Sequence, residues 1–247
     1  MSTSQVIAST SDWRTCAEQA TRRLAAITAI GGLLGLLVGG VGGRLAMMLL
    51  ARLNPEATGT TSDDGFRMGQ FTVPDTIGLL VTGTAFGVVG AGVYTVVRGL
   101  MVGPRWFQVL SVAGGPAVVV GATIVHTDGV DFHLLDPAWL AIGLFVAIPG
   151  MYAALLTWFA ERRLHDDSWF SRVPLRFAAA PLVLWIPLAP LLAVLVLLWA
   201  SGEGLRRTPR GARVLTHPAT SLVARLGLVA IFVLSLVDLG KDAIELT

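Results

Sequence analysis

The sequence predicts an all-α protein, a polytopic bundle of transmembrane helices with six spans that form a single domain over residues 24–240. Three observations support this class. Of the 247 residues, 54% are apolar and 14% are charged, whereas about 25% are charged in an ordinary soluble domain. The apolar residues gather in six runs, each long enough to cross the ~30 Å hydrocarbon core of a bilayer. Glycine recurs every fourth residue in the first run, which is typical of closely packed membrane helices.

Residues 1–23 are expected to form an N-terminal tail, with residues 1–10 disordered. The tail lacks the basic region, short apolar core and cleavage site of a signal peptide, so we expect it to be retained. Asp12 can cap a short helix that lies in the membrane interface with Trp13 at headgroup level. A frayed polar tail accounts for the same residues. Cys16 is the only cysteine, which excludes an intramolecular disulfide and a cysteine-based metal site.

The first predicted span covers residues 24–53. It carries four glycines that lie four residues apart and share one face of a helix, where a neighbouring backbone can come close: Gly31, Gly35, Gly39 and Gly43. Each glycine costs about 1 kcal/mol relative to alanine in a soluble helix, so the pattern favours a membrane helix. Thirty residues of helix reach roughly 45 Å, which means that this span must tilt or project from the bilayer.

Arg44 follows the glycine stripe as a permanent cation at the end of an otherwise uncharged run. Its side chain can snorkel, with the stem in the apolar region and the guanidinium at the outer boundary. If it lies about a turn deeper, it needs an anionic partner. We expect the snorkelling arrangement.

The second predicted span, residues 76–97, carries another stripe of small residues that could face the first: Gly83, Gly87 and Ala91. The polar residues 54–75 before it form a loop, because they include the turn-forming sequence Asp63-Asp64-Gly65 and two prolines. The third and fourth spans cover residues 106–125 and 138–160. Each contains a proline, and the one at position 116 is expected to kink its helix.

The first four spans resemble a duplicated helical hairpin. Phe71-x-x-x-Asp75 opens the second span and Phe132-x-x-x-Asp136 opens the fourth, and each hairpin ends in arginine followed by a Trp-Phe pair. Duplicated hairpins of this kind occur in transporter folds. The competing interpretation is that every hairpin needs helix caps and interfacial aromatic residues, which makes the two aspartates caps rather than ligands.

The distribution of arginine predicts the orientation. The N-terminal tail and the connections at residues 98–105 and 161–176 hold nine arginines, whereas the two acidic loops hold only Arg52 and Arg67. By the positive-inside rule the N-terminus is cytoplasmic and the acidic loops face outward. Every basic residue except Lys241 is arginine, which favours a high-GC bacterial genome and hence the cytoplasmic (inner) membrane of a bacterium.

The fifth apolar run, residues 177–200, allows two topologies. A single crossing gives six spans but places the arginines of residues 206–213 outside, against the positive-inside rule. A re-entrant hairpin that turns at Pro187 or Pro190 keeps those arginines inside and sends the C-terminus outside. The run has the length of one crossing, and a lipid-exposed turn leaves backbone groups unpaired. We therefore expect six crossings, with a weak last span at residues 219–237 and a short tail at 241–247.

No catalytic or cofactor signature is present: there is no phosphate loop, no dinucleotide-binding glycine pattern, no HExxH and no GxSxG. The histidines lie at or beyond the span ends, which argues against haem. The net charge of +2 does not indicate a nucleic-acid partner, because the arginines are confined to connections between apolar runs. We expect no catalytic residue, no cofactor and no metal.

One group of residues has functional potential, a candidate binding rim at the outer loops. If the hairpins pack through their glycine stripes, these loops converge and their carboxylates can bind a cation, a metal or a basic partner. Acidic outer loops and Asp-Gly turns explain the same residues without a site, and we favour that explanation. The rim consists of Arg44, Asp63, Asp64, His126, Asp128 and Asp131.

Several loose motifs run from Gly43 to Arg163: GGRLAMMLL, then DDGF with FT shortly after, then a glycine-rich span ending in arginine, then DGVDF before a proline-led span. This pattern resembles a group of uncharacterised multi-pass membrane proteins of actinobacteria and related bacteria. The resemblance implies a membrane bundle and no particular activity.

Three functions are compatible with the sequence. The first is a small-solute or ion permease, or an accessory to one, because of the duplicated hairpins, the proline-broken spans and the close glycine packing. The second is a scaffold or a partner subunit of a larger membrane complex, whose other subunits are different membrane proteins or further copies of this chain. The third is a lipid-modifying enzyme that uses the outer carboxylates. Transporters usually place ionisable residues at mid-depth in the membrane, and the predicted spans have few or none there. The scaffold function is therefore almost as well supported as the permease function.

Overall fold

The computed structural model describes residues 3–62, 65–101, 103–127, 132, 134–163, 173–208, 213 and 217–247. These residues form helices and connecting loops, and the β-structure among them is a single isolated bridge between Thr61 and Arg67. The all-α class predicted from the sequence is therefore confirmed.

Among the described residues, five helices are long and apolar enough to cross a membrane. They are the continuous segment made of α1 (Thr3–Leu34), the π-helix η1 (Gly35–Gly42) and α2 (Gly43–Leu53), then α3 (Val73–Val97), α4 (Arg105–Ile124), α5 (Ala138–Arg163) and α10 (Pro218–Leu246). Short 3-10 helices follow α2 and α3, at η2 (Pro55–Ala57) and η3 (Arg98–Leu100).

The N-terminal segment differs from the expectation of a disordered tail and a separate interfacial helix. α1 begins at Thr3 and continues without interruption into the first span. The physical reason is the composition, because neither glycine nor proline occurs between Thr3 and Gly31.

The expectation of six spans is not confirmed, because residues 177–200 do not form one long helix. The segment is divided into α7 (Leu175–Ala178), the 3-10 helix η4 (Ala180–Trp185) and α8 (Ala189–Arg207). Pro187 interrupts the helix, since it lacks a backbone N–H and disfavours α conformation in the residue before it. The apolar part of α8, Ala189–Gly202, is shorter than a membrane span.

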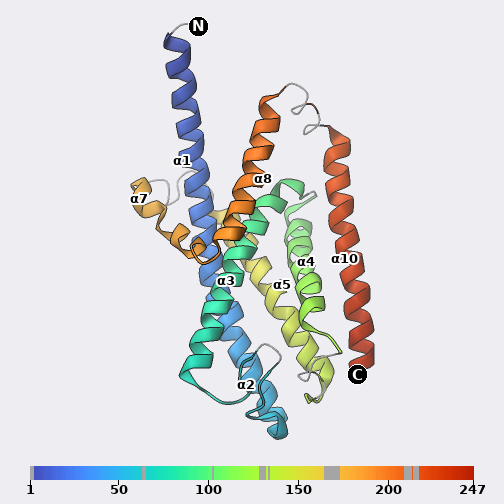
Figure 1. The fold of residues 1–247 in the computed structure, drawn as a ribbon. Helices are drawn as coiled ribbons and strands as arrows, with labels where there is room; N and C mark the ends of the chain where they lie inside the picture. Colours follow the sequence, from blue (N-terminus) through green and yellow to red (C-terminus); the bar gives the residue numbers. More distant parts are fainter. Residues whose placement is uncertain are drawn as a thin grey trace.

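Figure 1 shows the path of the chain between two ends of the bundle. The helices from α1 to α2 lead from the end that holds the N-terminus, here called the N-terminal end, to the opposite end, here called the loop end, and α3 returns. α4 and α5 form a second antiparallel pair that runs in the same directions, and α10 ends with the C-terminus at the loop end. From η4, in contrast, α8 leads back to the N-terminal end, so the segment from α7 to α8 enters the bundle and leaves on the same side (Figure 1).

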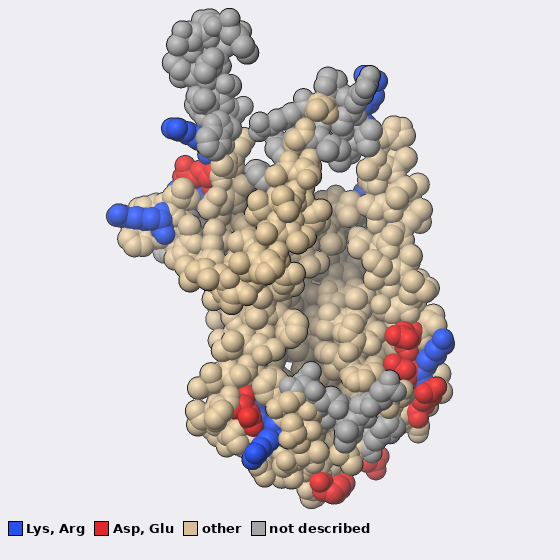
Figure 2. Space-filling view, in the orientation of Figure 1, with Lys and Arg blue, Asp and Glu red and all other residues tan. Residues whose placement is uncertain are grey.

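Charged side chains are distributed unequally between the two ends. In Figure 2 acidic side chains gather toward the loop end, and most of the visible basic side chains lie at the N-terminal end. The long apolar helices between them present many exposed leucine, valine and isoleucine side chains, most densely on α10. The structure thus has the charge and hydropathy pattern of a membrane-inserted bundle.

α1 and η1 contact α3 through glycine. An ideal Cβ on Gly31 would lie 2.5 Å from Ala91 Cβ, and one on Gly35 would lie 2.7 Å from Gly87 Cα and closer still to the Gly83 carbonyl oxygen. The two stripes named from the sequence therefore meet backbone to backbone. The hydroxyl of Tyr152 on α5 adds a hydrogen bond to the Gly87 carbonyl at this contact.

The π-helix changes which glycines face α3. An ideal Cβ on Gly40 would lie 2.9 Å from Leu80 Cα, whereas one on Gly39 would be 3.4 Å from Gly83 Cα, and one on Gly43 would meet only a leucine side chain at 3.8 Å. A π-helix has i→i+5 hydrogen bonds and a wider turn than an α-helix. After Gly35 the stripe therefore continues at Gly40 instead of Gly39, a shift of one residue that four-residue spacing does not predict.

Candidate functional site

The candidate site lies at the loop end, where residues 54–72 fold over the ends of α2 and α3. Within this loop, residues 60–62 pair with residues 66–68: the Ser62 N–H donates to the Phe66 carbonyl at 2.9 Å and the Met68 N–H donates to the Thr60 carbonyl at 3.0 Å. Glycines at positions 59, 65 and 69 have φ of 88°, 82° and 67°, conformations that side chains rarely adopt. Of the predicted turn residues, Gly65 adopts such a conformation, and Gly59 and Gly69 are two further turn positions that the sequence analysis did not name.

The two loops at this end pack on each other. Met68, Phe132 and Leu135 belong to one buried cluster, together with residues of α2 and α5. Asn54, which is 2% exposed, accepts a hydrogen bond from the Asp136 N–H at 2.8 Å and donates one to the Leu50 carbonyl at 3.0 Å. The described parts of the first and second loops therefore form one cap on the bundle.

Arg44 lies in the first turn of α2, beneath this cap, and is only 5% exposed. Its Nη1 donates to the Arg67 carbonyl at 3.0 Å, and its Nη2 donates to the Gln70 carbonyl. Arg44 therefore does not snorkel as expected, because the loop folds over it and supplies backbone carbonyls as its partners. No ion pair joins it to any carboxylate in the part of the chain that the structure describes.

Asp75 is the acidic side chain that the structure brings toward Arg44. Its N–H lies 3.4 Å from Thr72 Oγ1, so Thr72 is the N-cap of α3. Its Oδ2 is buried and has no hydrogen-bond partner among the described residues, and the charges of Arg67 and Arg44 act on the carboxyl group. The sequence predicted that Asp75 caps the helix, but Thr72 is the cap in the structure.

The remaining members of the predicted rim do not assemble around Arg44 in the described residues. His126 Nδ1 lies 2.9 Å from the Ile124 carbonyl oxygen and caps the end of its own helix. Four predicted residues lie outside the described part of the chain: Asp63, Asp64, Asp128 and Asp131. Among the residues that are described, no group of three or more His, Cys, Asp or Glu side chains could hold a metal ion.

A polar contact that the sequence did not indicate holds the segment from α7 to α8 on α1. Trp185, at the end of η4, is 1% exposed, and its Nε1–H donates to Thr28 Oγ1 at 3.0 Å. Thr28 lies on α1 and is completely buried. Leu184 of the same segment would meet a Cβ placed on Gly32 at 3.1 Å. One face of η4 is therefore packed against the first span through Trp185, whereas Val183 and Ile186 of the same segment are exposed.

A second polar cluster lies at the N-terminal end. Glu161, near the end of α5, accepts hydrogen bonds from Tyr94 Oη at 3.0 Å and from Arg98 Nε at 2.9 Å. Arg225 of α10 donates from Nε to the Leu100 carbonyl at 3.0 Å. These contacts join α3, α5 and α10, and the charged groups in them satisfy each other or a backbone carbonyl.

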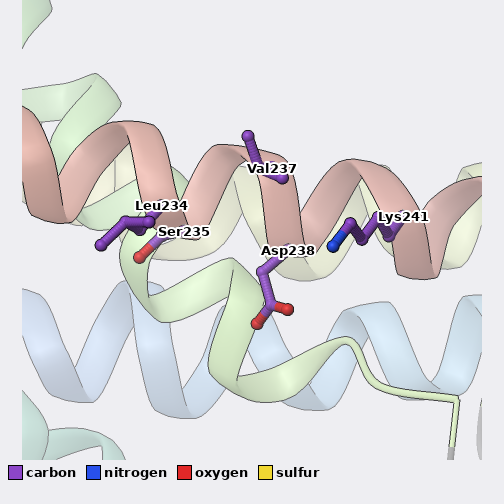
Figure 3. A pocket seen from close by; sticks show the side chains of 5 residues that line it. All are labelled: Leu234, Ser235, Val237, Asp238 and Lys241. Carbon is purple, nitrogen blue, oxygen red and sulfur yellow. The ribbon is translucent and has the colours of Figure 1, made fainter.

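The hollows in the described surface are shallow. One of about 350 Å³ is lined by five residues that all belong to α10: Leu234, Ser235, Val237, Asp238 and Lys241. Figure 3 shows Ser235 and Asp238 pointing toward the neighbouring helix and Val237 pointing away. Because one helix supplies the whole lining, this hollow is a surface groove and lacks the convergent walls of a small-molecule site.

Comparison with protein-family models, with curated proteins and with solved structures gave no match.

Proposed function

We propose that this protein is a multi-pass protein of the bacterial cytoplasmic membrane that acts as a small-solute or ion permease, or as an accessory to one. The observation that supports this proposal most directly is the break in the helix between η4 and α8, which the buried Trp185 anchors on α1. Irregular backbone at membrane depth is tolerated only where it is buried in protein or lines a water-filled cavity. Broken helices of this kind form the substrate sites of many transporters.

The surroundings of the turn agree with this proposal. In Figure 2 the surface is hollowed between α8 and α10, beside the point where α8 leaves the bundle. Trp185 and Thr28 hold the turn at a fixed place on α1. A duplicated hairpin, with α1–α3 as one copy and α4–α5 as the other, is part of the proposal, because both pairs run in the same directions (Figure 1).

The proposed topology has five crossings, with the N-terminus in the cytoplasm and the C-terminus outside. It removes the conflict that six crossings create, since the arginines after α8 then share the cytoplasmic side with the N-terminus. The acidic residues near the C-terminus, among them Asp242 and Glu245, then share the outer side with the loop end. Unpaired backbone groups argued against a re-entrant segment, but groups in this turn are paired locally: the Ile186 N–H donates to the Val183 carbonyl and the Leu188 N–H to the Trp185 carbonyl, both at 3.0 Å.

Cysteine labelling tests this topology. In a Cys16→Ser background, Thr208→Cys should be protected from an impermeant maleimide in intact cells and react after lysis. Glu245→Cys should react in intact cells, because α10 carries the C-terminus to the other side. Labelling at position 208 in intact cells, with protection at position 245, would instead support six crossings.

A flux measurement tests the permease activity. We expect vesicles that contain the purified protein to shrink and re-swell faster than protein-free vesicles for at least one solute in a panel of small neutral solutes and salts. Light scattering after an osmotic step is the readout. An unrelated helical membrane protein at the same density is the control, and equal rates for every solute in the panel would contradict a permease.

A scaffold or partner subunit is the second candidate function, and the poor burial of two helices favours it. Only 6% of the apolar 18-residue stretch of α10 is buried inside the protein. Large side chains of α8 such as Leu197 and Leu198 are exposed. Such surfaces contact either lipid or another membrane subunit. Purification in a mild detergent, followed by identification of stoichiometric protein partners, separates this function from transport by the protein alone.

A further inference from the structure

α10 is attached to the rest of the bundle near both of its ends. Toward the N-terminal end, Arg225 Nε donates to the Leu100 carbonyl at 3.0 Å. Toward the loop end, Leu239 is 9% exposed and belongs to the buried cluster that includes residues of α2 and α5. A Cβ placed on Gly121 of α4 would lie 3.6 Å from Leu239 Cδ2. The two attachments are separated by about 21 Å of helix, at a rise of about 1.5 Å per residue.

Between these attachments α10 stands away from the bundle. Residues 226–238 include no buried residue. Leu228, Phe232 and Ser235 lie on the face that carries both attachments, because they follow Arg225 at helical spacing. Figure 3 shows Ser235 pointing toward the neighbouring helix. Leu228 is nevertheless 37% exposed, so this side of α10 lacks close packing along the stretch.

α4 leaves the matching space open. Gly114 lies two helical turns before Gly121 and shares its face, yet a Cβ on Gly114 would meet no neighbouring atom within 4 Å. A Cβ on Gly121, in contrast, would lie 2.8 Å from Val146. α4 and α10 run in the same direction (Figure 1), so Gly114 is level with Phe232, and Figure 2 shows the surface hollowed beside this stretch of α10. This space is here called the α4–α10 slot, and it is lined by Gly114, Leu228, Phe232 and Ser235.

Arg225 lies at the mouth of the slot with most of its donors free. A guanidinium has five N–H donors, and in the described part of the chain only the Nε–H of Arg225 has a partner. No described carboxylate forms an ion pair with it. Arg98, at the same end of the bundle, differs because its Nε lies 2.9 Å from the Glu161 carboxylate. The charge of Arg225 is therefore uncompensated, and the Leu100 carbonyl keeps it at the edge of an apolar space.

We propose that the α4–α10 slot binds an acyl chain of an anionic phospholipid from the membrane leaflet at the N-terminal end, and that Arg225 binds the lipid phosphate. The terminal nitrogens of a guanidinium match two phosphate oxygens in a bidentate pair. The chain then runs along the slot past Leu228 toward Phe232. This inference rests on the membrane location proposed above and is independent of the permease activity.

The length of the slot and the charge at its mouth agree with this occupant. Half of the ~30 Å hydrocarbon core is about 15 Å, which is less than the about 21 Å between the two attachments of α10. An acyl chain of one leaflet therefore fits between them. An apolar helix of another subunit would fill the slot but leave Arg225 without a counter-charge, whereas an anionic lipid supplies both the packing and the charge.

The test is lipid binding to the purified, delipidated full chain in detergent. The rise in unfolding temperature during a titration gives the half-saturating lipid concentration, and native mass spectrometry counts the bound lipid. Phosphatidylglycerol should stabilise the protein at lower concentration than phosphatidylcholine with the same chains, because the choline cation offsets the phosphate. Inorganic phosphate should not stabilise it, since it has no chain to fill the slot. Arg225→Gln should raise the half-saturating concentration of phosphatidylglycerol roughly tenfold or more, because charged hydrogen bonds are lost.

Two pairs of variants separate this site from general attraction to lipid. Arg162 is an exposed arginine at the same end of the bundle, and Arg162→Gln should change the half-saturating concentration by roughly twofold at most. Gly114→Leu fills the slot and should raise that concentration roughly tenfold, because the acyl chain loses buried surface. Gly227→Leu is its control: a Cβ there also meets no neighbouring atom within 4 Å, but Gly227 lies on another face of α10, so lipid binding should be unchanged.

Several results would overturn the proposal. Equal weakening by Arg225→Gln and Arg162→Gln would mean general surface attraction, and undiminished binding in Gly114→Leu would mean that no chain enters the slot. Equal stabilisation by inorganic phosphate would indicate an ion site without a lipid, and a dimer that excludes lipid would assign the slot to a second copy. If Arg225→Gln does not fold, the comparison of Gly114→Leu with Gly227→Leu decides. No solute flux is measured, so failure here and failure of the permease are distinguishable.

Discussion

Gly35→Ala should destabilise the protein by about 2–3 kcal/mol, the range expected when a well-packed contact is overfilled, and Gly35→Leu should do so more strongly. The new Cβ would meet the Gly83 carbonyl oxygen and, at 2.7 Å, Gly87 Cα. Both obstacles are backbone atoms, so no side-chain rotation can relieve them, and the first span must move away from α3. Thermal unfolding in detergent is the measurement.

Two matched controls lie on the same helix. At Gly42 an ideal Cβ would meet only the Leu37 carbonyl of its own helix, at 3.7 Å, so Gly42→Ala should be neutral or slightly stabilising. Leu37 is 49% exposed, and Leu37→Ala should also do little. If Gly35→Ala is tolerated as well as these two changes, α1 does not pack on α3 through this stripe.

The same experiment distinguishes a π-helix from an uninterrupted α-helix. Gly40→Ala should lower the stability markedly, because the new Cβ would lie 2.9 Å from Leu80 Cα. Gly39→Ala should lower it only slightly, because its Cβ would lie 3.4 Å from Gly83 Cα. A regular α-helix continues the stripe from Gly35 to Gly39 and predicts the reverse order. The ranking of these two variants therefore reports the register directly.

Trp185→Ala should destabilise the protein by about 3–5 kcal/mol, the usual cost of removing a large buried aromatic side chain. The indole is 1% exposed and anchors η4 on α1. Its loss also leaves the buried Thr28 hydroxyl without the Trp185 donor. We expect a lower unfolding temperature and greater reactivity of the segment from α7 to α8 toward protease or cysteine reagents.

Smaller changes separate the hydrogen bond from the packing. Trp185→Phe keeps most of the aromatic surface and should cost about 1 kcal/mol for the hydrogen bond in addition to the volume lost. Thr28→Val removes the acceptor, and the double variant should cost less than the sum of the two single changes. Trp139, which is 65% exposed, is the control: a loss in Trp139→Ala equal to that in Trp185→Ala would contradict an anchoring role for Trp185.

The sequence by itself determined the all-α class, five of the six apolar spans that it predicted and the glycine stripes of the first two spans. These features depend on the length, composition and periodicity of single segments. A run of about 20 apolar residues crosses a bilayer as a helix, because every backbone group must be paired inside the segment. Glycines four residues apart share a face whatever the partner is, so the common face of Gly31 and Gly35 follows from local spacing.

Only the tertiary structure decided the features that depend on contacts between distant segments. Residues 177–200 are long enough to cross, and they turn back because Pro187 breaks the helix and Thr28, more than 150 residues earlier, receives Trp185. The shift from Gly39 to Gly40 arises in a wider helical turn that spacing does not reveal. Arg44 finds its partners in loop carbonyls, and no residue pattern marks a backbone oxygen as the acceptor, because every residue supplies one.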